Sequence, residues 1–161
     1  MVRSAYLHLG PARQLVHNLK YRGIQSAGRI LAEAMAPLVP PSAILVPVPR
    51  VAWRKIRHGI DPATILASHL ADLTGGRRVD LLVAPILGPS QARSSKSDRS
   101  APFFRAFKPP EGRVVLVDDV VTTGGTVLSA WRALGSGPAL VVSATSPGEL
   151  SVRAAPVGQG N

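Results

Sequence analysis

Two adjacent aspartates, Asp118 and Asp119, follow a short apolar run within Val114–Leu128, which reads VVLVDDVVTTGGTVL. The chain has only nine acidic residues. Two of them side by side at the expected end of a strand therefore indicate a functional role for the two carboxylates. Threonines and glycines come next, before an apolar helical pattern. A loop of this composition between a strand and a helix offers backbone N–H groups, hydroxyl donors and the partial positive charge of a helix N-terminus. The stretch therefore predicts an anion-binding loop beside two carboxylates.

The ligand that suits both features carries hydroxyls next to a phosphate. The carboxylates would accept hydrogen bonds from a neutral polyol or bind a metal carried by the anion, and a phosphorylated ribose has both groups. A P-loop would need lysine after its second glycine, but Gly125 is followed by Thr126. A dinucleotide-binding fingerprint would need three spaced glycines, and the acidic strand of an NTPase would need a preceding P-loop. A plain solvated turn with two surface aspartates stays open as the alternative.

Length and composition favour one folded domain without covalent or metal cross-links. The chain has 161 residues, of which 45% are hydrophobic, and no cysteine. We expect a single domain over residues 1–146 and a loose tail over residues 147–161. The lack of cysteine excludes disulfides and zinc–thiolate sites and fits a reducing compartment. No apolar run reaches about 18 residues, and no signal peptide is evident. These features predict a cytoplasmic protein with no membrane span.

The net charge of +10 comes mostly from arginine. One guanidinium group can bind two phosphate oxygens at once. The positive charge therefore suits either a small polyanionic substrate or nucleic acid. A generally arginine-rich surface explains the charge equally well, because net charge alone does not identify a partner.

The hydrophobic patterns predict alternating strands and helices. Residues 1–9 read as extended or frayed chain. We expect helices over residues 11–20, 24–35, 61–73 and 126–134, and strands over residues 43–48, 81–87, 113–117 and 139–144. The alternation predicts an α/β fold with a parallel sheet covered on both faces, ligands bound at the carboxyl ends of the strands, and an N-terminal helical hood formed by the helices before Ala43.

Two further segments are expected to reach the same edge of the sheet. Val48, Pro49 and Arg50 form a proline-stiffened turn that could seat a pyrophosphate, although a solvated basic loop fits the pattern as well. The long polar stretch Gly88–Lys108 is functional or disordered, with Phe103, Phe104 and Phe107 expected to anchor its end to the core. Asp61 precedes Pro62 as the N-cap of the next helix.

Val114–Thr126 resembles the PRPP-binding motif of type I phosphoribosyltransferases: four apolar residues, two acidic residues and a Thr/Gly loop. The resemblance implies the type I phosphoribosyltransferase fold and makes Asp118 and Asp119 the catalytic pair that holds the ribose 2′ and 3′ hydroxyls. Thr122–Thr126 would then bind the 5′-phosphate. The PRPP-binding set implied is Asp118, Asp119, Val120, Thr122, Thr123, Gly124, Gly125 and Thr126. Mg²⁺ would be held through PRPP oxygens and water and not directly by the protein.

The wider chain resembles the ComF subgroup of competence-related, phosphoribosyltransferase-like proteins. The matching segments are LKYRG at 19–23, LVPVPR at 45–50, RHGIDPATILA at 57–67, and Gln91 with Arg99 in the long loop. The chain lacks the cysteine zinc ribbon with which this family usually opens, and it has Val83–Leu87 where many members carry arginines. The resemblance implies transfer of a phosphoribosyl group, with pyrophosphate release, to an unknown acceptor.

The alternative is a non-catalytic accessory protein of DNA uptake. Such a protein would contact single-stranded DNA or a competence partner, and it could be an oligomer. Single strands stack on exposed aromatic side chains, but the chain has only two tryptophans. Trp131 is expected in the core, whereas Trp53 lies in a basic turn where it could be exposed.

Overall fold

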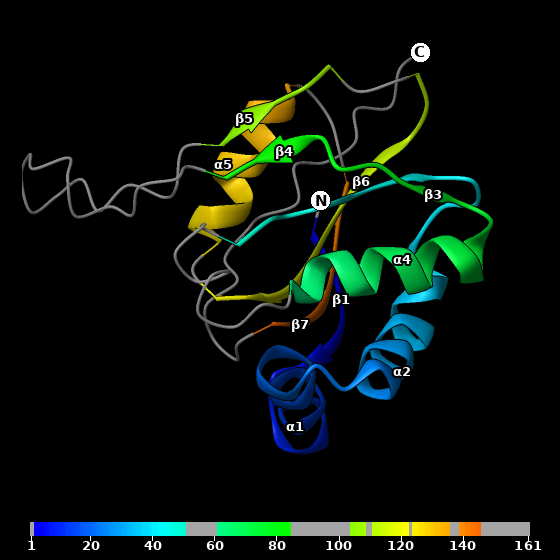
Figure 1. The fold of residues 1–161 in the computed structure, drawn as a ribbon, viewed down its shortest axis with the longest axis vertical. Coiled ribbons are helices and arrows are strands. Elements are labelled where there is room, and N and C mark those ends of the chain that lie inside the picture. The colour runs from blue at the N-terminus through cyan, green and yellow to red at the C-terminus, as the bar shows by residue number, and fades with distance from the viewer. Residues whose placement is uncertain are drawn as a thin grey trace, which may run out of the picture.

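The computed structural model shows a parallel sheet between helical layers (Figure 1). It describes residues 2–50, 61–84, 104–108, 111–122, 124–135 and 139–145. The strands are β1 Val2–Leu7, β2 Ile44–Pro47, β3 Arg77–Arg78, β4 Leu82–Val83, β5 Arg105–Ala106, β6 Val114–Val121 and β7 Ala139–Thr145. The helices are α1 Gly10–His17, the π-helix η1 Asn18–Arg22, α2 Gln25–Met35, the 3₁₀-helix η2 Ala36–Leu38, α4 Pro62–Thr74 and α5 Gly125–Leu134.

The main sheet has five strands in the order β1-β7-β6-β2-β3, and every neighbouring pair is parallel. The expected parallel α/β fold is confirmed. The N-terminal segment, expected to be extended or frayed, is ordered as the edge strand β1, which pairs with β7 from the other end of the described chain. The register places Leu7, Thr145 and Val121 at one level, so β1, β7 and β6 end at the same edge of the sheet.

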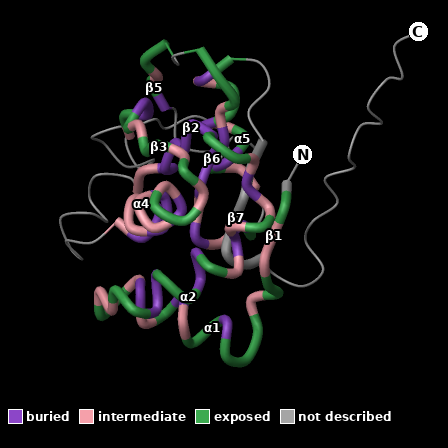
Figure 2. The backbone as a smooth tube through the Cα atoms, turned by 90° about the vertical axis from the view of Figure 1, so that its right-hand side faces the viewer, coloured by how far each residue is buried: buried purple, intermediate pink, exposed green. Residues whose placement is uncertain are grey.

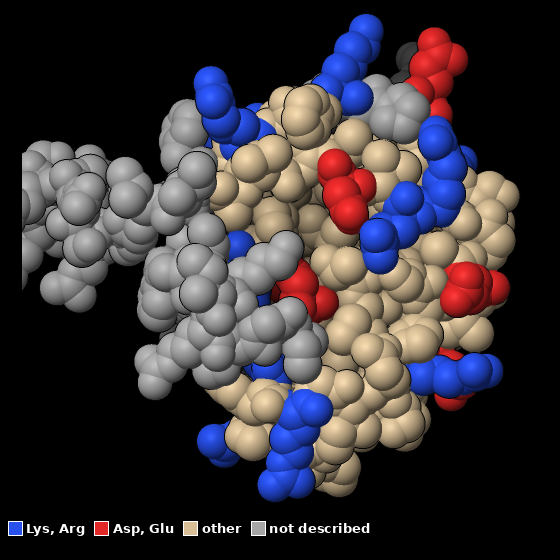
Figure 3. Space-filling view, in the orientation of Figure 1, with Lys and Arg blue, Asp and Glu red and all other residues tan. Residues whose placement is uncertain are grey.

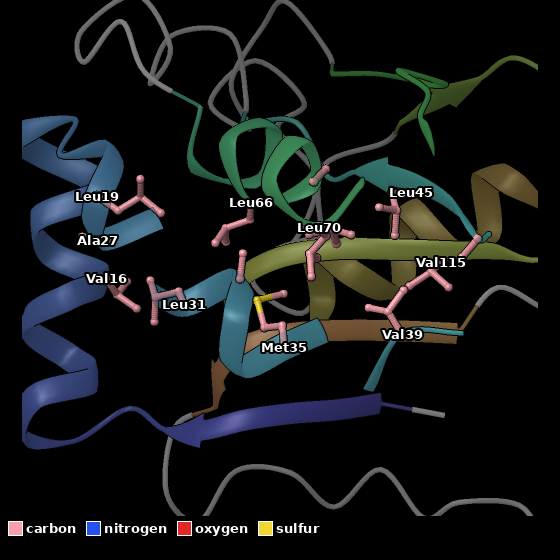
Figure 4. Close-up of a cluster of buried hydrophobic side chains, with 14 residues drawn as sticks. Val16, Leu19, Ala27, Leu31, Met35, Val39, Leu45, Leu66, Leu70 and Val115 are labelled. Carbon is pink, nitrogen blue, oxygen red and sulfur yellow. The ribbon is translucent and has the colours of Figure 1, made fainter. Parts of the chain in front are cut away.

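Alternating side chains of β2 and β6 divide the core between the two sheet faces. Leu45 and Val115 belong to a cluster with α1, η1, α2 and α4, whereas Val46 and Leu116 belong to a second cluster with α5 and the β4–β5 region. Figure 4 shows the first cluster, in which side chains from the helices meet those of the sheet. Figure 2 shows buried positions along β2 and β6, while α1 and α2 alternate between buried and exposed. This two-sided cover explains why β2 and the first four residues of β6 are apolar throughout.

In the middle of the chain, one predicted strand has another partner than expected, and one strand was missed. The strand expected over residues 81–87 does not join the parallel sheet, because β4 pairs antiparallel with β5 in a separate two-stranded sheet. Short apolar runs show where a strand forms but not which partner it takes. The strand β3, which no apolar run marked, takes the edge position beside β2 through two residues.

The aromatic residues also differ from expectation. Phe104 is buried in the second cluster, as expected, but Phe107 is 63% exposed. Phe103 lies outside the described residues. Trp131, expected in the core, is 40% exposed on α5. The apolar stripe of α5 is completed by Val127, Ala130 and Leu134, so position 131 falls on the outer side of the helix.

Within the described part of the chain, no helix is long and apolar enough to cross a membrane.

Candidate functional site

The two aspartates lie inside β6 and not beyond its end, because β6 runs from Val114 to Val121. Val115 and Val117 point into the cluster under the N-terminal helices, and Asp119 follows the same alternation. It contacts Lys20 of η1 on that side. Asp118, one residue earlier, is on the same side of the strand as Leu116. It lies level with Val142 of β7. Neighbouring positions on one strand thus place the two carboxylates in different surroundings.

Asp119 has the smallest exposed fraction of the charged residues in the described part of the chain, 6% of its surface. Its Oδ1 atom lies 3.0 Å from Lys20 Nζ and accepts a hydrogen bond of 2.6 Å from the Val120 backbone N–H. Its Oδ2 atom lies 3.7 Å from Arg50 Nη2. Buried carboxylates are tolerated when their charge is matched, and here two cations from different segments match one carboxylate.

Asp118 has a different electrostatic environment. Burial raises its pKa well above the ordinary value, and the negative charge of Asp119 adds to the increase. The Asp119 backbone N–H, which donates to Asp118 Oδ1 over 2.8 Å, and the charge of Lys20 act in the opposite direction. The pair therefore combines one carboxylate balanced by cations with one that takes up a proton more readily, and both suit hydroxyl donors.

The proline turn predicted to seat pyrophosphate lies directly beside the aspartates. The Val48 backbone N–H donates to the Val117 carbonyl over 2.9 Å, which holds the turn level with the start of the acidic pair. The Arg50 backbone N–H donates to Asp61 Oδ2 over 3.3 Å. Asp61 stands at the N-cap position of α4 as predicted, but its side chain makes no capping bond to the helix. It holds the turn instead, and Arg50 reaches Asp119.

The Gly/Thr loop connects β6 to α5. Gly124 has φ of 77°, a left-handed conformation that glycine adopts without strain, and α5 begins at the next residue. A Cβ atom at Gly124 would meet no other atom within 4 Å among the described residues. Thr122 and Thr126 are exposed, and Thr123 lies outside the described residues. The first-turn N–H groups of a helix have no intrahelical partner and are available to an anion.

Sequence reasoning missed two residues near the acids, Lys20 and His8. Lys20 lies in the LKYRG segment, but nothing in that segment indicated contact with β6, since the contact depends on how the helices fold back over the sheet. His8 directly follows β1 at the edge where β6 ends, and its Nδ1 atom is buried with no hydrogen-bond partner among the described residues. Burial lowers the pKa of His8; the charges of Lys20 and Arg13 add to this, and Asp119 opposes it.

Other predicted site residues lie outside the described part of the chain. These are Gln91 and Arg99 of the long loop, together with Trp53. Within the described residues, no three His, Cys, Asp or Glu side chains form a group that could hold a metal ion. Asp119 already faces two cations. That Mg²⁺ is held through PRPP oxygens and water stays a prediction.

The sequence matches the family of phosphoribosyl transferase domains over residues 22–148, and the chain belongs to this family. The matched range includes the proline turn, both aspartates and the Gly/Thr loop. It begins after Lys20 and His8. No curated protein sequence matches the chain.

Solved structures align with the chain at low sequence identity, and the first of them shows the same fold. An allosteric regulatory enzyme of purine biosynthesis aligns with a TM-score of 0.51 and 22% identity, over 74% of this chain and 26% of that one. Adenine phosphoribosyltransferase from Leishmania tarentolae aligns with a TM-score of 0.41 and 22% identity, over 74% and 54%. The glutamine mutant from an analysis of an invariant aspartic acid in HPRTs aligns with a TM-score of 0.43 and 14% identity, over 79% of both chains. The chain spans about a quarter of the first of these proteins and about half of the second.

Proposed function

We propose that this protein binds PRPP and transfers its phosphoribosyl group to an acceptor, with release of pyrophosphate. The observation that carries the proposal is the acidic pair of β6, which lies beside an Arg50-bearing turn and ahead of a glycine loop that opens α5. Membership of the phosphoribosyl transferase family supports it. PRPP has the matching groups: a ribose diol, a 5′-phosphate and a pyrophosphate.

The proposed placement of PRPP follows from the donors and acceptors available. Asp118 and Asp119 would accept hydrogen bonds from the ribose 2′ and 3′ hydroxyls. The backbone N–H groups and hydroxyls of residues 122–126 would bind the 5′-phosphate at the start of α5. The turn Val48–Arg50 would lie against the pyrophosphate, and Gln91 and Arg99 of the long loop are included in the proposed site. When Mg²⁺ is bound with PRPP, it supplies positive charge to the pyrophosphate.

The reaction breaks the bond between ribose C1 and the pyrophosphate oxygen and forms a bond from C1 to the acceptor, whose proton leaves with solvent or a base. Positive charge develops on the ribose in the transition state. The protein would contribute mainly by positioning the ribose and by placing fixed charges around it. In this placement, the carboxylates of Asp118 and Asp119 would supply negative charge near the ribose.

The ComF-like assignment is part of the proposal. It is supported by LKYRG, whose lysine reaches Asp119, and by LVPVPR, whose arginine does the same.

The acceptor would be identified by a screen of metabolites in which pyrophosphate release is measured. On the face shown in Figure 3, the Lys and Arg side chains of the described residues are separated by uncharged surface and by acidic side chains.

A calorimetric titration of PRPP, with and without Mg²⁺, tests the proposal. We expect saturable binding, with affinity reduced at least about tenfold in the Asp118→Asn/Asp119→Asn variant, because charge-assisted hydrogen bonds to the diol are lost. Glu33→Gln is the matched control, since it removes an acid from the exposed face of α2. No heat of binding at millimolar PRPP, or equal affinity in the double variant and the control, would contradict the proposed function.

A further inference from the structure

The ion pair between Lys20 and Asp119 joins the N-terminal helices to the candidate ribose site. Lys20 is the central residue of η1, a five-residue π-helix between α1 and α2. Its ammonium lies 3.0 Å from Asp119 Oδ1, and its side chain is only 24% exposed. Short π-helical segments are uncommon and occur often at functional sites. The turn ends at Gly23, whose φ of 64° is left-handed.

A ribose hydroxyl that binds Asp119 Oδ1 would compete there with the Lys20 ammonium and the Val120 N–H. The Oδ1 atom of Asp119 already accepts from both, and its Oδ2 atom faces Arg50. The Val120 N–H is part of β6 and cannot leave. The Lys20 ammonium sits on a flexible four-carbon stem and carries three donors, so it is the group that can move when a hydroxyl arrives.

PRPP itself brings an anion to the place where the ammonium would be released. Its pyrophosphate is attached to C1, the carbon next to the one that carries the 2′ hydroxyl. If the hydroxyl on Asp119 is the 2′ hydroxyl, the pyrophosphate oxygens would lie near the carboxylate. If the Lys20 ammonium exchanges the Asp119 carboxylate for a neighbouring pyrophosphate, it keeps an anionic partner. The positive charge of Lys20 is then not left unpaired.

We propose that Lys20 is a substrate-binding residue, which leaves Asp119 and binds the C1 pyrophosphate of PRPP when the ribose hydroxyls take its place on that carboxylate. This inference rests on the proposed function. It assigns a role in binding to Lys20 of η1, which lies before the first residue of the family match. It also couples ribose binding to the position of the helices that cover this side of the sheet.

The test compares Lys20→Met with Arg29→Met, which removes the same charge from an exposed i,i+4 pair on α2. Titrations use two probes: PRPP, and ribose 5-phosphate, which has the diol and the 5′-phosphate but no pyrophosphate. We expect Lys20→Met to weaken PRPP binding by about tenfold or more, the loss of one charge-assisted hydrogen bond. Ribose 5-phosphate should bind as well as to the wild type or better, since its diol no longer competes with the lysine.

Other outcomes overturn the inference. Equal PRPP affinities of Lys20→Met and Arg29→Met would mean that Lys20 does not touch PRPP, and tighter PRPP binding by Lys20→Met would make the lysine a competitor only. If Lys20→Met lost affinity for PRPP and for ribose 5-phosphate to the same extent, Lys20 would only position Asp119. Lys20→Gln, measured together with the melting temperature, covers the case in which the methionine variant folds poorly. A wild-type protein that binds no PRPP would refute the proposed function first and this inference with it, whereas binding that ignores Lys20 refutes the inference alone.

Discussion

At the scale of single residues, the two neighbouring aspartates should contribute to stability with opposite signs. Asp119 is balanced by Lys20 and Arg50, so its removal leaves two partly buried cations without their carboxylate. Asp118 has a pKa raised by burial and by its neighbour, so its ionised form is disfavoured in the fold. Functional sites commonly retain groups that cost stability, and relief of that cost stabilises the protein.

We therefore expect Asp119→Asn to lower the free energy of unfolding by about 1–3 kcal/mol and Asp118→Asn to raise it at neutral pH. A raised pKa in the folded state means that stability is fully present below the unfolded-state pKa and falls as the pH rises through the folded-state value. The advantage of Asp118→Asn should accordingly vanish near pH 3 and grow toward neutrality.

Melting curves of both variants between pH 3 and pH 8, beside Glu33→Gln as an exposed control, measure this difference. Stabilisation of about 1 kcal/mol would raise the melting temperature by about 2–4 °C in a chain of this size. A pH-independent effect of Asp118→Asn, or an increase in stability for Asp119→Asn, would show that the carboxylates do not have these two environments.

The residue types of the site could be predicted from the sequence because the acidic pair and the Gly/Thr loop are contiguous. The partners of Asp119 could not be predicted in this way. Lys20 and Asp119 are far apart along the chain, and the ion pair depends on the fold of the N-terminal helices over the sheet. Arg50 was predicted to lie near the aspartates because both strands end at one edge, and the structure brings the two together.

At the scale of elements, the packing of α2 against α4 fixes the position of η1 and therefore of Lys20. Gly28 of α2 is buried at this contact. A Cβ atom there would lie 2.9 Å from Ile65 Cγ2 and 3.2 Å from Leu19 Cδ1. Leu19 precedes Lys20 in η1, so the close approach that glycine permits also anchors the lysine-bearing turn.

Gly28→Ala should lower the free energy of unfolding, measured by urea titration. Forcing a methyl group into a packed core costs about 1–3 kcal/mol, and the better helix propensity of alanine returns about 1 kcal/mol of that. Ser26→Ala, at an exposed position of the same helix, is the control and should change stability by less than about 0.5 kcal/mol. If Gly28→Ala were as stable as the wild type or more stable, the two helices could accommodate the added methyl group at this contact without a cost in free energy.

Elements with a long apolar pattern were predicted well, and short ones were not. The expected helices over residues 24–35, 61–73 and 126–134 match α2, α4 and α5 within a residue or so. The two-residue strands β3, β4 and β5 depend on pairing with distant segments. Their sequences carry little periodicity of their own, so sequence patterns cannot assign their partners.

At the scale of the whole molecule, the fold brings three separated segments to one edge of the parallel sheet. The proline turn after β2, the acidic end of β6 and the lysine of η1 meet at Asp119. The general rule for open parallel sheets predicted this edge from the sequence. It could not predict that the long loop would leave a separate small sheet, because β4 looks like any other short apolar strand.

The most direct measurement of the central claim is a crystal structure of the protein with PRPP and Mg²⁺. We predict ribose hydroxyls within hydrogen-bond distance of the Asp118 and Asp119 carboxylates, and the 5′-phosphate on the backbone N–H groups of residues 122–126. PRPP bound elsewhere, or bound with its diol turned away from both aspartates, would contradict the assignment of this edge as a phosphoribosyl-binding site.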